Sequence, residues 1–220
     1  MDFADLVMLF LSGVWGTVKL FGVTLVGCLV LGSILAAMRV SPTPVLRAAA
    51  SVYITTVRNT PLTLVMFFCV FGLPFLDIRA SHDSAINSFV LACVALIAYT
   101  SCFVAEVLRS GISTIPVGQA EAARAIGLNF GQTLRYIIMP QAFRTVIPPL
   151  GSVIIAMLKN TSIASAFNNR EIISAMRNAI EVRGDITLLV IAGAAVSYLV
   201  LALILGRVFT ILENKWVIHR

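Results

Sequence analysis

A lysine interrupts one of the most apolar parts of the chain. Lys159 lies within a mostly apolar run from about Val146 to Phe167, and Asn160, Thr161 and Ser162 follow it directly. A charged group inside a bilayer is costly and therefore usually serves function. An ammonium group with amide and hydroxyl neighbours is suited to bind the carboxylate of an amino acid. These four residues are the candidate substrate-binding site.

The depth of Lys159 supports this interpretation but leaves alternatives open. It lies 13 residues after Val146, so it is roughly 20 Å along a helix that rises 1.5 Å per residue, beyond the middle of the membrane on the outer side. Lys159 could instead pair with Glu106 or with a backbone carbonyl for structure. Its side chain could also extend to the membrane surface.

Two other charged residues lie at the ends of apolar runs. Glu106 lies at the end of the run from about residue 85 to 107, where it is either a helix-end or interface residue or a ligand for a substrate amino group. Arg58 lies near the start of the run from about residue 52 to 76. Its long side chain could reach the interface, or it could form a gate or an inter-subunit ion pair in the pathway.

Other kinds of chemistry have little support. The cysteines lie in apolar runs without a CxxC pair, which is typical of small buried residues, so we predict neither a metal site nor a disulfide. No nucleophile–base pair indicates an enzyme. The sequence contains no GxxxxGK[ST] phosphate-binding loop, so ATP hydrolysis by this chain is not predicted. The energy for any transport must then come from a partner or an ion gradient. The cysteines are Cys28, Cys69, Cys93 and Cys102.

The composition indicates an all-α membrane protein. Of 220 residues, 59% are hydrophobic and only 12% are charged, whereas soluble domains have about 25% charged residues. A helix needs about 20 apolar residues to cross a bilayer. We therefore predict a single transmembrane domain over residues 1–220 with five transmembrane helices, preceded by an interfacial segment over residues 1–17. The predicted spans cover about residues 18–38, 52–76, 85–107, 146–167 and 186–211.

The distribution of basic residues predicts the orientation. The net charge is +6, but the basic residues lie between apolar runs, which is typical of membrane topology and not of nucleic-acid binding. Lys and Arg are enriched in cytoplasmic segments, and one set of segments holds most of them. We therefore expect the N-terminus outside, and the 109–144 loop and the C-terminus in the cytoplasm. This set is Arg39, Arg47, Arg58, Arg109, Arg124, Arg135, Arg144, Arg207, Lys215 and Arg220.

The long loop over residues 109–144 has the features of an ordered structure. Pro116 can begin a helix, and Gly127 can end it in a left-handed conformation. Asn129 can cap a second helix, with Gln132 completing a capping box, and Pro140 is expected to stop that helix. The result would be a compact knob of two short helices. An ordinary helical loop on the membrane surface is the alternative.

The same loop contains a family motif. Glu121-Ala122-Ala123, Gly127, Ile137 and Pro140 follow the order E-A-A-x3-G-x9-I-x2-P. This pattern resembles the EAA loop of ATP-binding-cassette importer permeases. The resemblance implies a coupling helix that docks in a groove of a separate ATPase subunit, which would bind ATP and Mg²⁺. Ala122 and Ala123 would allow close approach to that partner, while Glu121 and Arg124 would make charged contacts.

Three further segments resemble the polar amino-acid permeases of this family. Residues 58–62 resemble its R-G-T-P-L segment, with Asn59 in place of glycine, and residues 98–112 resemble its A-Y-x-S-A-Y-x-A-E-x-x-R-x-G-I pattern. Residues 158–162 also match, with Asn160 where an acidic residue is frequent. The resemblance implies the type I importer permease fold in a bacterial inner membrane. The implied complex has two permease subunits, two ATPase subunits and an external solute-binding protein.

The substrate and the alternatives follow from these segments. Lys159 and the basic outer loop over residues 168–185 favour glutamate or glutamine. In that loop Ile172, Ile173, Met176 and Ile180 recur at helical spacing, which predicts an amphipathic helix that seals the bundle or contacts the binding protein. An ion-coupled secondary transporter or a channel subunit is the alternative. However, there is no internal repeat, which such transporters often have.

Overall fold

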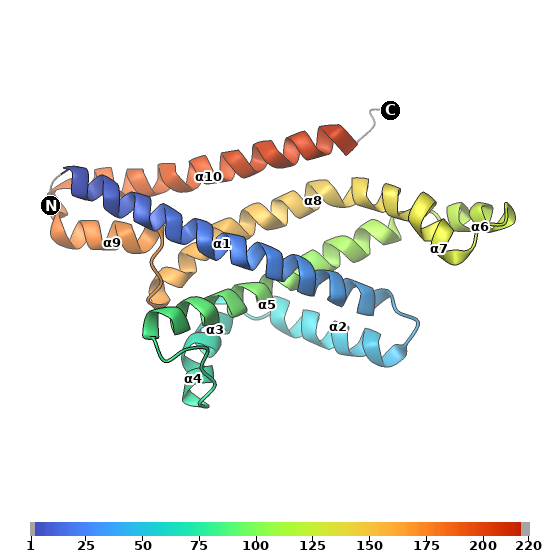
Figure 1. The fold of residues 1–220 in the computed structure, drawn as a ribbon, viewed down its shortest axis with the longest axis horizontal. Helices are drawn as coiled ribbons and strands as arrows, with labels where there is room; N and C mark the ends of the chain where they lie inside the picture. The colour runs from blue at the N-terminus through green and yellow to red at the C-terminus, as the bar shows by residue number, and fades with distance from the viewer. Residues whose placement is uncertain (1–2, 217–220) are drawn as a thin grey trace.

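In the computed structural model, residues 3–216 are described, and every regular element within that range is a helix. The long helices are α1 (Phe3–Val40), α5 (Ser84–Ser113), α8 (Met139–Asn160) and α10 (Thr187–Trp216). Figure 1 shows these helices running roughly lengthwise through the molecule. In this part of the chain, four helices are long and apolar enough to cross a membrane, or five if one bent pair is a single span. The expected all-α membrane fold is thus confirmed.

Helix α1 is longer than the predicted first span. It continues without a break over 38 residues, so an interfacial segment separate from a span at 18–38 is not observed. No proline occurs before Pro42, and the four glycines between Gly13 and Gly27 are tolerated because the helix is packed by its neighbours. At 1.5 Å per residue the helix is about 57 Å long, well beyond the roughly 30 Å of bilayer hydrocarbon.

The second predicted span, residues 52–76, is not one straight helix. Helix α2 (Pro44–Arg58) is followed by α3 (Leu62–Phe67), the π-helix η1 (Phe68–Gly72) and α4 (Leu73–Phe75), and the two parts meet at 103°. The break lies at Asn59-Thr60-Pro61. Pro61 lacks an amide hydrogen and disfavours a helical conformation at Thr60, so the chain turns here.

Helix α5 forms the centre of the bundle. It packs against α1, α2, α3 and α8, and its small residues Ala92, Ala95, Cys102 and Ala105 are almost completely buried. All four cysteines of the chain are buried and free, which confirms that they are small core residues. The small side chains let neighbouring helices approach closely.

The 109–144 loop folds as a projecting knob. Helix α6 (Val117–Ala125) is followed by α7 (Phe130–Thr133) and the π-helix η2 (Leu134–Ile138). Figure 1 shows α6 and α7 extending beyond the bundle at one end. The expected stop at Pro140 is wrong: Pro140 lies in the first turn of α8, where its missing N–H is not needed.

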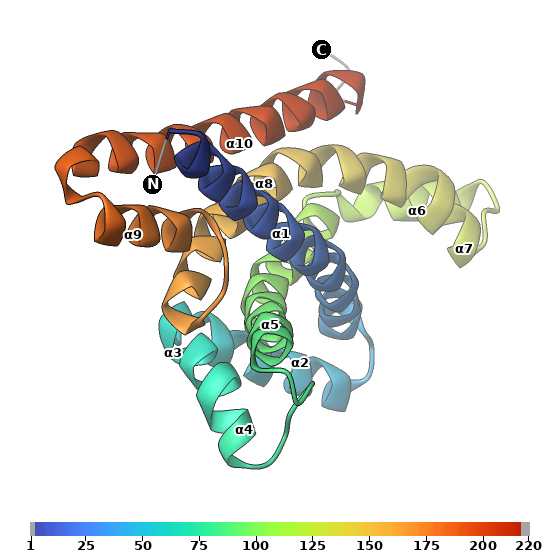
Figure 2. The same cartoon turned by 60° about the vertical axis from the view of Figure 1, so that its left-hand side comes forward.

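The opposite end of the bundle contains helix α9 (Ile172–Val182), which lies in the predicted 168–185 loop. Helix α8 continues as the 3-10 helix η3 (Thr161–Phe167), after which come α9, the 3-10 turn η4 (Gly184–Ile186) and α10. Figure 2 shows α9 close to the N-terminal half of α1 and the start of α10, far from α6 and α7. The predicted amphipathic helix is confirmed, because its face with Ile172, Ala175 and Ala179 is buried.

Candidate transport groove and coupling loop

One face of α5 lies along one face of α8. The α5 positions 99, 103, 106 and 110 and the C-cap residue Thr114 are three or four residues apart and therefore share a helix face. The α8 positions 145, 149, 153, 156 and 160 do the same. The helices are antiparallel, since Thr114 at the end of α5 lies beside Thr145 near the start of α8, with hydroxyl oxygens 3.5 Å apart. Two hollows lie between them, both lined by residues of these faces.

The hollow farther from α6 and α7, named the outer hollow for its place in the chain's two-helix groove, has a volume of about 210 Å³. Its polar side chains are Asn160, Thr100 and the phenol of Tyr99, and the rest of its lining is apolar or aromatic. Thr100 is only 3% exposed, and its hydroxyl has no hydrogen-bond partner within residues 3–216. A buried hydroxyl without a partner is uncommon and indicates a place where a ligand or water completes the bonding. The hollow is lined by Tyr99, Thr100, Phe103, Val153, Ala156, Met157 and Asn160.

The four predicted substrate residues do not form one patch. Of these four, only Asn160 lines the outer hollow. Lys159 is exposed on the surface of the chain, and Thr161 and Ser162 donate their hydroxyl hydrogens to the carbonyls of Leu158 and Lys159, both at 2.7 Å. Consecutive helical residues point in different directions, so neighbours in sequence diverge in space.

Sequence reasoning overlooked the α5 side of this hollow. Tyr99, Thr100 and Phe103 lie within residues 98–112, which resemble a family pattern, but none of the three is predicted from the sequence to line a site. The signal that could have found them is the helical spacing of 99, 103, 106 and 110, which puts aromatic and polar side chains on one face of an otherwise apolar helix.

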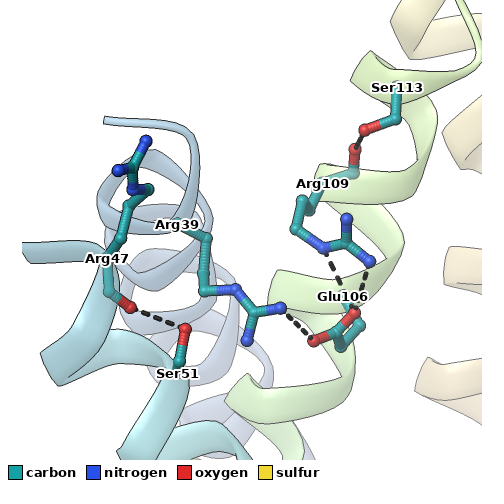
Figure 3. A network of polar contacts seen from close by, with 6 residues as sticks. All are labelled: Arg39, Arg47, Ser51, Glu106, Arg109 and Ser113. Atoms are coloured by element: carbon teal, nitrogen blue, oxygen red, sulfur yellow. Dashed lines mark hydrogen bonds and ion pairs between the residues drawn. The ribbon is translucent and has the colours of Figure 1, made fainter. Parts of the chain in front are cut away.

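The inner hollow has a volume of about 350 Å³ and includes Glu106. Figure 3 shows the Glu106 carboxylate between two guanidinium groups. Its Oε1 lies 3.4 Å from Nη2 of Arg39, and its Oε2 lies 3.1 Å from Nη2 and 3.3 Å from Nε of Arg109. Glu106 therefore ties the end of α1 to α5 as an interface residue, and it is not a helix-end residue, because α5 continues to Ser113. The alternative of a Lys159–Glu106 pair is wrong.

Arg58 is placed by the bend in the chain. It is the last residue of α2, directly before the 103° turn, and it is exposed. This places the guanidinium at a junction of two helices rather than within a continuous span.

The knob is built on Gly127 as predicted. Gly127 has φ +85°, a conformation that L side chains rarely adopt. Its N–H donates to the carbonyl of Arg124 at 3.0 Å, and the N–H of Leu128 donates to Ala123 at 3.1 Å, which together form a Schellman motif. The capping box is also confirmed: Asn129 and Gln132 exchange side chain–backbone hydrogen bonds of 2.9 Å in both directions.

The exposure of the coupling residues divides them into two groups. Glu121, Ala122 and Arg124 are exposed, together with apolar Val117 and Ile126 (72% and 77% exposed). These residues form the accessible tip of the knob. The expectation that Ala123 approaches a partner is not supported, because it is 3% exposed and lies within the knob. Ile137 and Pro140 are half-buried at the base of the knob.

A second polar junction, not predicted from the sequence, lies at the opposite end. Glu171 is completely buried and caps the start of α9. Its Oε1 accepts a hydrogen bond from the N–H of Ser174 at 2.6 Å, and its Oε2 accepts one from the N–H of Ile173 at 2.8 Å. Tyr198 of α10 donates its hydroxyl hydrogen to Oε2 at 2.8 Å. Thr17 of α1 accepts from the N–H of Ile172 at 3.2 Å. Glu171 thus joins α9 and α10 next to α1. The sequence feature that could have predicted this cap is Ser174, three residues after Glu171. The pair forms a capping box with the usual positions of the acidic residue and the serine exchanged.

Burial raises the pKa of the Glu171 carboxyl above its ordinary value of 4.5, against the opposing effects of its hydrogen bonds and of Arg177. The folded state then holds this proton more tightly than the unfolded state. The contribution of this group to stability is therefore fully present below pH 4.5 and is lost as the pH rises through the folded pKa.

The Glu171→Gln variant tests this dependence. The melting temperature of wild type minus that of Glu171→Gln should fall as the pH is raised from below 4.5 to neutral, because only wild type carries the titrating carboxyl. Thermal unfolding of the purified protein at a series of pH values measures the difference. A difference that is constant over this range would contradict the assignment.

Comparisons with known proteins show the family of this chain. Residues 29–218 match the family described as "Binding-protein-dependent transport system inner membrane component". The chain is 46% identical over 223 residues to the glutamate transport system permease protein GluC of Corynebacterium efficiens, covering 99% of this chain and 98% of the relative. It is 47% identical over 209 residues to the protein of that name in Corynebacterium glutamicum, covering 92% of each.

A solved structure extends the similarity to three dimensions. It is described as an amino acid ABC transporter with histidines, and it matches with a TM-score of 0.83 and 29% identity over 98% of this chain and 99% of that chain. The expected permease fold is confirmed by this match. The chain therefore belongs to the family of inner membrane components of binding-protein-dependent transport systems, and its identification as an amino-acid ABC importer permease is confirmed.

Proposed function

We propose that this chain forms one side of the pathway by which an ATP-driven importer moves glutamate or glutamine across a bacterial inner membrane. The observation that carries this proposal is the outer hollow, where Asn160 and the unpartnered Thr100 hydroxyl lie between two apolar membrane helices. The names of the relatives favour glutamate, and a more distant relative in Bacillus subtilis is named as a probable glutamine permease. A channel or ion-coupled transporter gives no role to the projecting knob.

The remaining polar residues fit a pathway completed by a second permease subunit. Lys159 is exposed one residue before Asn160, so its ammonium group is available to a carboxylate held between two subunits. Ser162 keeps acceptor lone pairs after donating to the helix backbone, whereas Thr161 is completely buried and would support the site from within the bundle. Arg58, at the bend after α2, would act as a gate where the helices change direction.

The knob fits a groove of a separate ATPase subunit that binds ATP and Mg²⁺. Its exposed tip combines apolar Val117 and Ile126 with charged Glu121 and Arg124, as partner-binding surfaces often do. Ala123, Gly127, Ile137 and Pro140 would keep the tip rigid. With the knob in the cytoplasm, the N-terminus and α9 face outside, where α9 is available to a solute-binding protein.

Loss of the polar groups in the outer hollow should reduce uptake. Asn160→Ala and Thr100→Val each remove one hydrogen-bonding group worth about 1 kcal/mol, so we expect about fivefold slower uptake at low substrate concentration for each. Initial rates of radiolabelled uptake by the reconstituted complex measure this. Ser197→Ala is the matched control, since its hydroxyl bonds within α10 and does not line the hollow. Wild-type rates in both hollow variants would contradict the site.

The substrate is tested by competition among amino acids. The complex of this permease with its ATPase, second permease and binding protein should take up L-glutamate or L-glutamine in preference to L-histidine, L-arginine and L-cystine. A panel of radiolabelled amino acids presented to proteoliposomes gives the ranking. Preference for a basic amino acid would contradict the proposed substrate while leaving the permease assignment intact.

A further inference from the structure

The inner hollow has the chemistry of an amino-acid site. It lies on the same two helix faces as the outer hollow, displaced toward the coupling loop. Its volume of about 350 Å³ falls within the range of ligand sites, roughly 300–1,000 Å³. Its lining contains both charge signs and several hydroxyl groups: Glu106, Val107, Arg109, Ser110, Gly111, Thr114, Thr145 and Pro149.

The charges around Glu106 do not balance. One carboxylate faces the two guanidinium groups of Arg39 and Arg109, which leaves an excess of one positive charge at the hollow. Arg109 uses Nε and Nη2 to bond Glu106, while its Nη1 has no partner among residues 3–216. Its guanidinium can therefore donate further hydrogen bonds, and guanidinium groups suit carboxylates.

Two threonine hydroxyl groups in the lining of the inner hollow are arranged to accept hydrogen bonds. Thr114 donates its hydroxyl hydrogen to the carbonyl of Gly111 at 2.7 Å, and Thr145 donates to that of Ala142 at 2.9 Å. With their hydrogens engaged, the two oxygens lie 3.5 Å apart and keep lone pairs for an external donor. An ammonium group is a donor without acceptor capacity and matches them.

From these contacts we propose that the inner hollow is a second binding site for the transported amino acid, on its way to the cytoplasm. Arg109 binds the α-carboxylate, Thr114 and Thr145 accept from the α-ammonium group, and Glu106 orients Arg109. This inference rests on the proposed function, because it takes the groove as the substrate path. A site at the cytoplasmic end can be filled from inside as well as from outside, so internal amino acid should slow import.

The test uses proteoliposomes with the complete complex and ATP, and it measures uptake of the proposed substrate, L-glutamate or L-glutamine. Unlabelled substrate is added inside at increasing concentrations. Wild-type uptake should be inhibited from inside. Arg109→Gln should raise the internal concentration for half-inhibition about tenfold, since it removes a charge-assisted pair of hydrogen bonds. Arg109→Lys keeps the charge and should restore most of the inhibition.

Arg47→Gln is the matched control. Arg47 lies on α2 at the same end of the molecule, and Figure 3 shows its guanidinium directed away from Glu106. Its removal should leave inhibition unchanged. An equal shift in Arg47→Gln and Arg109→Gln would mean a general charge effect and would overturn the proposal, as would a wild-type complex that is insensitive to internal substrate.

A milder variant guards against loss of folding. Thr145→Val preserves shape and leaves the Glu106 network untouched, and it should raise the half-inhibiting concentration about threefold. If the Arg109→Gln complex does not assemble, Thr145→Val provides the test. A half-inhibiting internal concentration equal to that of wild type would then overturn the proposal. The two sites have separate readouts: uptake by Asn160→Ala without internal substrate tests the outer hollow, and the internal concentration for half-inhibition tests the inner hollow. If Asn160→Ala slows that uptake while Arg109→Gln and Thr145→Val keep wild-type inhibition, only the inner site is refuted and the proposed function stands.

Discussion

Replacement of Gly16 by alanine is expected to disrupt the junction of α1 and α9. A Cβ atom at this position would overlap the carbonyl oxygen of Arg170. The atoms that the Cβ atom would meet belong to the backbone of Arg170 and Glu171, so no flexible side chain can move aside. Relief requires α1 to shift away from the start of α9, which breaks the Thr17–Ile172 hydrogen bond and uncovers Glu171.

The expected magnitude follows from overpacking and lost hydrogen bonds. Overpacking costs about 1–3 kcal/mol, and a lost buried hydrogen bond adds about 1–3 kcal/mol. We therefore expect Gly16→Ala to lower stability by about 3 kcal/mol and to reduce the yield of folded protein. Thermal unfolding of the purified protein measures the change.

Gly22→Ala on the same helix provides the control. Nothing lies within 4 Å of a Cβ atom there, and alanine favours a helix by about 1 kcal/mol over glycine. This variant should be as stable as wild type or more stable. Equal unfolding temperatures for the two variants would show that the close approach of α1 to Arg170 is not maintained.

The second large effect is expected at Gly127. Valine at φ +85° is strained, since left-handed backbone costs about 1–2 kcal/mol for an L residue and more for a β-branched one. The Schellman hydrogen bonds from Gly127 and Leu128 would be lost together. The tip with Val117 and Ile126 would then lose its fixed position. We expect Gly127→Val to keep membrane insertion but to lower substrate uptake per ATP hydrolysed about tenfold or more.

Gly118→Val is its matched control. Gly118 lies in α6, and a Cβ atom there meets nothing within 4 Å, so the added side chain starts in open space and leaves the turn at Gly127 in place. Parallel measurement of ATPase activity and uptake in proteoliposomes compares the two. Wild-type coupling in Gly127→Val would mean that the knob does not transmit motion.

Local features of the fold were predictable because they depend on neighbouring residues. Gly127 and the Asn129–Gln132 capping box were found from a few adjacent side chains, and the apolar runs located the long helices. The 103° bend was only hinted at by Pro61, because a proline shows where a helix breaks and not the direction in which the chain continues. Pro140 was misjudged, since proline at the start of a helix and after its end look alike in sequence.

The site depended on contacts that the sequence does not contain. Asn160 was separated from Lys159, Thr161 and Ser162 only when the helix rotation was known. Thr100 became a candidate because its hydroxyl is buried and without a partner in the described chain. The Glu106–Arg39 pair joins residues from two helices, and its geometry depends on how α1 and α5 pack.

The central claim is that this chain provides the path while a partner hydrolyses ATP. The most direct measurement is uptake of radiolabelled L-glutamate and L-glutamine by proteoliposomes that contain this permease with and without its ATPase, at matched permease content, with the binding protein outside. We predict uptake only when the ATPase is present and ATP is available to it. Sustained uptake by the permease in vesicles that lack the ATPase would contradict the account.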